Sequence, residues 1–485
     1  MVGGATLQVA PGGSIALNSS IALIGGGISI DGQLVARAGS VTVNAAQNGS
    51  TIWTGDVELH SGGVIDTRGL WVNDFLSGST ATPTLYDGGN VSLAAYGSVR
   101  IDAGAMIDAS SGGWMQGNGR IKTSNGLPVG TGGNITVISN GFGATLHNSA
   151  TIAQSYPGRV YLDGTVRSYG FTRGGALSIA TPAIQIGGDA ILTLRTVSSI
   201  NAEGTSNLTP VDPASVLRLS PGFFAGGGFS QYALYSYQNL TVAAGTDLEL
   251  HGVNLIPNLQ AVSAPSGSDV ADVATARALP SYQPSAPVNL VLSAIDAFNG
   301  NLNVQRGAAI NADPQATISL HARRQLTVDG TINAPAGTIN LDLTGVPGPW
   351  VPIGSAAGTP PYNGPFYAAT QTLWIGADAR LLAPGLVTST LDPLGRPVNT
   401  VLGGGQVNIN QDAQPSLYYP YSATQPYGEQ PLGVVVAQAG AIIDVSGASG
   451  TIRQAAGRSG TTQSPIATAG GSVAIRASLG DRKST

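Results

Sequence analysis

The chain has 485 residues, of which 69 are glycine and 29 are proline, and it contains no cysteine. Charged residues make up 10% and the formal net charge is −5, with no stretch in which Arg or Lys clusters, so the composition excludes the basic footprint of a nucleic-acid-binding protein. The absence of cysteine excludes disulfides, metal–thiolate sites and thiol nucleophiles.

The residue types indicate an almost all-β chain. Lysine and glutamate, which favour helices, are nearly absent. Gly, Asn, Asp, Val, Ile and Thr dominate instead, and these residues favour strands and turns. The hydrophobic content of 42% argues against a disordered chain.

Glycine pairs followed by alternating apolar residues recur along the first part of the chain. The pairs Gly88-Gly89, Gly132-Gly133 and Gly174-Gly175 lie 44 and 42 residues apart, a spacing that we interpret as two repeats of 21 or 22 residues. Later in the chain the single period is visible, since Ile318 and Ile339 are 21 residues apart. A period in the low twenties is typical of a solenoid.

One repeat is predicted to contain three very short strands, Val91–Leu93, Val99–Ile101 and Ala105–Ala109. Alternation with a period of two places the following side chains inward: Val91, Leu93, Val99, Ile101, Ala105, Ile107 and Ala109. It places Ser92, Arg100, Met106 and Asp108 outward. Stacking such coils about 4.8 Å apart would join their backbones and form one apolar column. The sequence therefore predicts a right-handed parallel β-helix with coils of about 21–22 residues and extended loop insertions.

The predicted β-helix has two segments. The first covers residues 1–255 and the second, its continuation, covers residues 289–485. Residues 256–288, rich in Ser, Ala, Pro and Asp, are predicted to form a linker or loop with one short helix from Val270 to Ala278.

Four further stretches interrupt the regular pattern. Loop excursions are predicted at 110–130 and 196–239 in the first segment, and aromatic loops at 345–374 and 415–432 in the second. Exposed Tyr and Trp residues suit carbohydrate or protein recognition because they combine a rigid contact area with a polar group. The candidate ligand-contact residues are Trp350, Tyr362, Phe366, Trp374, Tyr418 and Tyr419.

Two octapeptides, Ala103–Ser110 (Ala-Gly-Ala-Met-Ile-Asp-Ala-Ser) and Ala439–Ser446 (Ala-Gly-Ala-Ile-Ile-Asp-Val-Ser), lie close to Gly-Gly-x-Val-x-Leu or Gly-Gly-Ser-Val-x-Ile strands. In these units, and in the stretch from Phe223 to Gly245, the chain resembles the filamentous haemagglutinin family of large exoproteins, exported by two-partner secretion from Gram-negative bacteria. The resemblance covers nearly the whole chain. The Asn-Pro-Asn motifs of the family's secretion domain do not occur here, so we expect an internal segment of a longer protein.

The resemblance implies a structural shaft of a secreted or cell-surface adhesin that supports attachment to host cells or other bacteria. It implies two kinds of partner: an outer-membrane two-partner secretion transporter, reached through a domain outside this chain, and host glycans or surface proteins. An autotransporter passenger fragment would have the same solenoid and remains an alternative.

Parallel β-helices also include polysaccharide lyases and glycosidases, so a carbohydrate-active enzyme is the rival from another class. Asp66, Asp108 and Asp444 occupy one phase of the repeat, which favours solvent-facing residues that cap turns over a catalytic pair. The four histidines lack metal-ligand spacing. We predict no enzymatic activity, no catalytic or metal-binding residue and no cofactor.

No apolar run approaches the roughly 20 residues that a membrane-spanning helix needs, so no transmembrane segment is predicted. Neither end of the chain offers a convincing cap for a solenoid. We therefore expect the chain to associate end to end or to fray at its terminal coils.

Overall fold

The computed structural model describes residues 6–9, 14–16, 20–45, 47–48, 51–52, 55–78, 82–124, 126–139, 158–188, 195–200, 206–210, 215–279, 286–295, 300–343, 372–391, 397–410, 434–456 and 460–476. This part of the chain is mostly strand, and its few helices have four or five residues each. The prediction of an all-β chain is confirmed.

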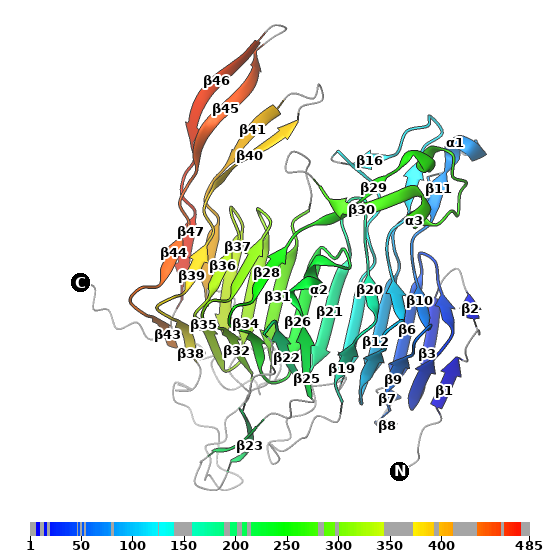
Figure 1. Cartoon of the computed structure of the whole chain (residues 1–485), viewed down its shortest axis with the longest axis horizontal. Helices are drawn as coiled ribbons and strands as arrows, with labels where there is room; N and C mark the ends of the chain where they lie inside the picture. The colour runs from blue at the N-terminus through cyan, green and yellow to red at the C-terminus, as the bar shows by residue number, and fades with distance from the viewer. Residues whose placement is uncertain are drawn as a thin grey trace, which may run out of the picture.

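Eleven strands form one parallel sheet, the long sheet, which runs along the molecule (Figure 1). Each strand pairs in register with the next one along the chain that belongs to this sheet. In order, the strands are β3 (Ser20–Ile24), β6 (Ser40–Ala45), β12 (Asn90–Ala95), β18 (Ile135–Ser139), β21 (Ala176–Thr181), β26 (Gln231–Ser236), β31 (Asn289–Ala294), β34 (Thr317–Ala322), β37 (Thr338–Leu343), β42 (Gln406–Ile409) and β47 (Ser472–Ile475).

Two shorter parallel sheets accompany the first part of the long sheet. Sheet NA contains β1 (Thr6–Val9), β4 (Gly27–Ile30), β9 (Val57–Leu59), β13 (Val99–Ile101) and β19 (Val160–Leu162). Sheet NB contains β2 (Ser14–Ala16), β5 (Gln33–Val35), β10 (Val64–Asp66), β14 (Met106–Asp108) and β20 (Thr165–Arg167). The chain visits NA, NB and the long sheet in turn, and we call three such successive strands a coil.

Two other parallel sheets accompany the second part of the long sheet. Sheet CA contains β25 (Val216–Leu219), β22 (Ala183–Ile186), β27 (Leu240–Val242), β32 (Asn301–Val304), β35 (Gln325–Val328), β38 (Thr372–Ile375) and β43 (Val434–Ala437). Sheet CB contains β28 (Asp247–Leu250), β33 (Ala309–Ala312), β36 (Thr331–Asn333), β39 (Arg380–Leu382) and β44 (Ile442–Asp444). Two small antiparallel pairs lie outside these sheets: β7 (Gln47–Asn48) with β8 (Thr51–Ile52), and β23 (Arg195–Ile200) with β24 (Ser206–Pro210).

The inward side chains of these sheets make one continuous hydrophobic core. Every residue predicted to point inward between Val91 and Ala109 is buried. The buried positions stay in register from strand to strand, as in the series Leu290, Ile318 and Ile339 of the long sheet. Parallel pairing in register keeps the apolar face of each strand on the same side, so the core extends lengthwise.

The predicted repeat length of 21–22 residues is found only in coils without an insertion. Ile318 pairs with Ile339, 21 residues later, as predicted. The glycine pairs spaced by 44 and 42 residues, however, precede strands that pair directly, β12 with β18 and β18 with β21. The same spacing of 42 residues separates Ile65 and Ile107 on the directly paired strands β10 and β14. Our interpretation of this spacing as two repeats is wrong, because the additional residues leave the sheets and return within one coil.

Sheets NA and NB are followed by CA and CB, and at this transition one coil has a helix in the position of a strand. The strand β25 pairs with β22 on the edge opposite to β27. The helix α2 (Pro221–Ala225) follows β25 and packs against β28, the first strand of CB. Phe223, Phe224 and Phe229 surround the ring of Tyr232 on β26. The predicted loop excursion at 196–239 is therefore wrong for β25, α2 and β26, which belong to the core.

Candidate functional site

Two groups of elements project from the sheets. Both leave at the same corner, where the chain passes from NB or CB to the long sheet, and Figure 1 shows them on the same side of the molecule. At three turns that the structure describes in full and that carry no projection, four residues cross this corner. The third residue of each such turn has a positive φ: 53° at Ala38, 67° at Gln315 and 52° at Ala336. Elsewhere the same corner accepts insertions of many residues without disturbing the sheets.

The first projection, which we call the accessory lobe, is built from described residues within 67–87, 109–131, 168–174 and 251–279. Its elements are β11 (Trp71–Asn73), α1 (Asp74–Ser77), β15 (Gly113–Met115), β16 (Thr123–Ser124), β17 (Leu127–Pro128), β29 (Val253–Pro257), η3 (Leu259–Val262), α3 (Val270–Val273) and β30 (Ala274–Ala278). A separate small core fills it, with Trp71, Met115 and Phe171 on one side and Leu255, Ala261, Val270, Val273 and Ala274 on the other.

The segment predicted as a linker folds back over earlier coils. The Nδ2 of Asn73 donates hydrogen bonds to the carbonyls of Val262 and Ala264, at 3.0 and 2.8 Å. The Nδ2 of Asn254 donates to the carbonyls of Phe171 and Thr172, at 3.0 Å each. The described residues up to 279 are thus packed, and the linker interpretation of 256–288 is wrong for them.

Two further predictions need correction within this lobe. The helix predicted from Val270 to Ala278 ends at Val273, because Ala274–Ala278 pairs with β29 as an antiparallel strand. The segment 110–130 is not a simple loop either, since β15 pairs in parallel with β11 of the preceding coil.

A cluster of alternating charges joins the lobe to the sheets. Arg68 contacts three carboxylates, those of Asp66 (2.8 Å), Asp108 (3.6 Å) and Asp269. Arg37 adds a second contact to Asp66 at 2.9 Å, and Arg167 adds one to Asp108 at 2.8 Å. Asp269 is the N-cap residue of α3. The ionic cluster therefore connects the segment 251–279 of the lobe to strands β10 and β14.

The ionic cluster favours the charged forms of Arg68 and Asp269. Burial lowers the pKa of Arg68, but its hydrogen bond to Asp66 and the nearby carboxylates more than compensate and raise it above its ordinary value. Burial raises the pKa of Asp269, but the backbone N–H of Ala271 and the charge of Arg68 outweigh this and lower it overall.

Asp66, Asp108 and Asp444 cap turns as predicted. In each case Oδ1 accepts a hydrogen bond from the backbone N–H two residues later, at 3.1, 3.0 and 2.9 Å. The prediction that they face solvent is wrong for two of them, since Asp66 is 5% and Asp108 1% exposed under their arginine partners. Both carboxylates thus bind backbone N–H groups and arginines, as structural residues do.

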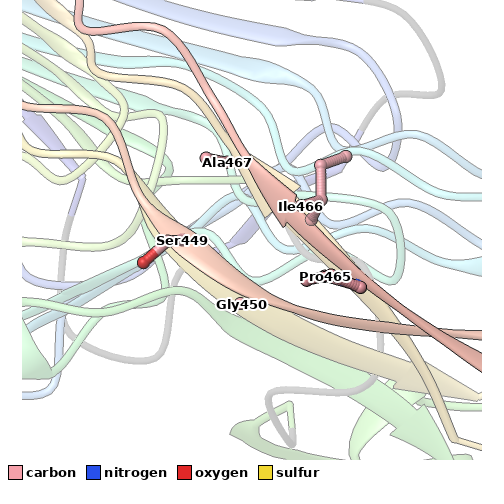
Figure 2. A pocket seen from close by; sticks show the side chains of 5 residues that line it. All are labelled: Ser449, Gly450, Pro465, Ile466 and Ala467. Carbon is pink, nitrogen blue, oxygen red and sulfur yellow. The ribbon is translucent and has the colours of Figure 1, made fainter.

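The second projection consists of two stacked hairpins, which we call the paired hairpins. The hairpin of β40 (Leu386–Leu391) and β41 (Pro397–Leu402) lies beside that of β45 (Ser449–Ala456) and β46 (Gly460–Ala467). The Nδ2 of Asn399 joins them by donating to the carbonyl of Thr451 at 3.0 Å. Figure 2 shows a shallow hollow where β45 starts and β46 ends, lined by Ser449, Gly450, Pro465, Ile466 and Ala467.

Most of the exposed large apolar side chains among the described residues lie on these projections and at the C-terminal end of the sheets. The exception is Ile24 of β3, at the other end of the long sheet. Among described residues, the lobe presents Phe75, Leu76, Leu85, Leu259 and Val262. The paired hairpins present Val387 and Ile466, and the last coil presents Ile442, Val473 and Ile475. The chemically distinctive surface of the described chain is therefore the corner with its projections and not the regular wall.

The structure describes one of the six predicted ligand-contact residues. Trp350, Tyr362, Phe366, Tyr418 and Tyr419 lie outside the described residues. Trp374 is described, and it belongs to β38 of sheet CA, where it pairs between Thr327 and Val436 and is half-buried. The predicted loop 345–374 is thus wrong for its last three residues, which form part of the wall.

Within the described ranges, no group of three or more His, Asp or Glu side chains is placed to hold a metal ion. Sequence reasoning missed the lobe and its ionic cluster because their contacts join residues far apart in the chain. It also missed a visible signal, the string Glu-Leu-His, which occurs at 58–60 and again at 249–251.

No helix among the described residues is long and apolar enough to cross a membrane. Comparisons with protein-family models, with curated proteins and with solved structures found no match for this chain. The function is therefore argued from the residues and the geometry described above.

Proposed function

We propose that the chain is a right-handed parallel β-helix and a structural shaft segment of a large secreted bacterial adhesin, similar to the filamentous haemagglutinins. The observation that carries the proposal is the long sheet, whose eleven parallel strands pair in register and keep their inward positions aligned. Each coil contacts mainly its neighbours, so length is added without changing the cross-section. The right hand follows from the strong preference of parallel crossover connections.

The projections support an adhesive role for such a shaft. A rigid wall that is regular over many coils offers few distinctive contacts, whereas insertions at one corner hold side chains away from it. Aromatic residues of the loops, including Trp350, Tyr362 and Tyr419, suit host glycans or surface proteins as ligands. The proposal includes a location outside the cell, delivery by an outer-membrane two-partner secretion transporter, and no enzymatic activity.

The test is a binding assay with beads coated with the chain, on cultured host cells and on immobilised glycans. A variant with Trp350, Tyr362 and Tyr419 changed to Ala should bind at least about tenfold more weakly, since each ring contributes roughly 1 kcal/mol or more at a contact. Trp374→Ala is the matched control, because this ring lies on the wall, and it should bind like the wild type.

Three results would contradict the proposal. Absence of binding to every cell and glycan surface would contradict the adhesive role. Binding by the loop variant as strong as that of the wild type would contradict a contribution of the loops to binding. Release of reducing ends or unsaturated products from a polysaccharide, abolished by changing one aspartate, would favour the enzyme alternative.

A further inference from the structure

The tripeptide Glu-Leu-His occurs twice, and each copy sits at the end of a strand. Glu58-Leu59 ends β9 of sheet NA, and Glu249-Leu250 ends β28 of sheet CB. In both copies the leucine is buried in the core, so the glutamate before it and the histidine after it lie on the outer surface.

Each histidine lies between two carboxylates, one of them from the next coil. The Nδ1 of His60 is 2.9 Å from Asp102, which follows β13, and its Nε2 is 3.6 Å from Glu58. The Nδ1 of His251 is 2.9 Å from Asp313, which follows β33, and its Nε2 is 3.0 Å from Glu249. We call these two arrangements the histidine clasps.

The number of protons on the ring decides whether a histidine clasp is satisfied. A carboxylate only accepts hydrogen bonds, and both ring nitrogens face one. Neutral imidazole carries one N–H, so its other nitrogen presents a lone pair to a carboxylate oxygen. At His251 only the imidazolium donates to both carboxylates, whereas at His60 the imidazolium donates to Asp102 and attracts Glu58, 3.6 Å away, by charge alone.

The charges around both clasps are mainly negative. Asp31 acts on His60 from the preceding coil, while Arg100 reaches only the far oxygen of Asp102, at 4.0 Å. At the second clasp, Asn311 donates to Asp247 and Glu249 at 3.0 and 2.9 Å and brings no charge.

We propose that the two histidine clasps are proton-controlled links between consecutive coils, closed when the ring is an imidazolium and loosened when it is neutral. Each clasp joins coils through side chains at the surface, in addition to the backbone ladder. Two copies in different sheets give the shaft two places at which the stiffness of its wall depends on pH.

The direction of the pH dependence follows from the pKa values of the two rings. The hydrogen bond that His60 donates to Asp102 raises the pKa of His60 above 6.5, against a smaller effect of burial, and the hydrogen bond to Asp313 does the same for His251. A raised pKa means that protonation stabilises the folded state. The stabilisation is complete below pH 6.5, while the carboxylates stay ionised, and it is lost as pH rises through the raised value.

Hydrogen exchange at pH 5.5 and 8.5, corrected for the intrinsic rates, tests the proposal on the whole chain. In the wild type, the backbone around residues 58–63, 100–105, 247–252 and 310–315 should be better protected at pH 5.5. The double variant His60→Gln and His251→Gln should lose this difference. His321→Gln is the control, because His321 lies on β34 of the long sheet, outside both histidine clasps, and it should leave the difference unchanged.

A titration of the wild-type chain by ¹⁵N NMR provides a second measurement that needs no variant. His60 and His251 should both still carry two ring protons in more than half of the molecules at pH 6.5. Ordinary or lowered pKa values for both rings would overturn the proposal, as would a double variant that keeps the wild-type pH difference. Neither result bears on adhesion, so the shaft function stands or fails separately.

Discussion

At the scale of single residues, the ionic cluster shows why a local pattern predicts only part of a side chain's environment. Asp66 and Asp108 cap their turns through backbone N–H groups nearby in the sequence, and this role was predictable. Their burial was not, because Arg68, which covers both of them, is held in place by Asp269, which lies 201 residues further along the chain than Arg68. Buried carboxylates of this kind need a paired cation to remain charged.

Arg68→Met is expected to destabilise the fold by about 1.5–3 kcal/mol, since it removes the cation shared by three carboxylates, while Arg37 and Arg167 still pair with Asp66 and Asp108. Urea unfolding followed by circular dichroism measures this. The matched control is Arg306→Met, whose partner Asp378 lies at 2.6 Å on the exposed surface, and it should change stability by about 0–1 kcal/mol. Similar small effects for both variants would show that the ionic cluster contributes little.

At the scale of elements, the repeated glycine pairs have a steric cause. Gly89, Gly133 and Gly175 stack where the chain returns to the long sheet. A Cβ atom on Gly133 would lie 1.9 Å from the carbonyl oxygen of Gly89, and one on Gly175 would lie 1.9 Å from that of Gly133. The glycine pairs thus mark the points where successive insertions rejoin the sheet in close backbone contact.

Gly133→Ala is therefore expected to cost about 2 kcal/mol or more, because the neighbour that must move is backbone in an adjacent strand region. Gly222→Ala in α2 is the control, since its Cβ would meet nothing closer than 3.8 Å, and it should be neutral or stabilise by about 0.5–1 kcal/mol. The melting temperatures of both variants decide the question. A Gly133→Ala variant as stable as the wild type would mean that the close backbone contacts at the stacked glycines do not require glycine.

At the scale of the whole molecule, the two ends of the long sheet differ. The inward residues Ile21 and Leu23 of β3 are 4% and 8% exposed. Their counterparts at the other end, Val473 and Ile475 of β47, are 43% and 58% exposed, although they continue the register of buried Val407 and Ile409. The last coil of the described chain therefore leaves part of the apolar column open to solvent.

Hydrogen exchange should follow this difference. We expect β43, β44 and β47 to exchange faster than β31, β34 and β37, because local opening is easiest where few buried contacts resist it. The N-terminal strand β3 serves as the internal comparison, and it should be better protected than β47. Equal protection of β3, β47 and the central strands would contradict the expectation that the exposed end frays.

Much of the local structure was predictable from the sequence. The alternation around Val91, Val99 and Ile107 identified buried positions correctly, because the period of a strand is a property of a few successive residues. The tight coils near Ile318 were found for the same reason, since their pairing partners lie about one period away. The prediction of an all-β chain rests on composition alone and needed no long-range information.

The tertiary structure decided what the insertions do. The sequence by itself could not show that Ile65 and Ile107 are direct neighbours, since a spacing of 42 residues fits two tight coils as well as one coil with an insertion. It could not place Asp269 against Arg68 or Trp71 beside Phe171, because such contacts depend on where a long segment folds back. Strand alternation is written into neighbouring residues, whereas the accessory lobe exists only through packing between distant ones.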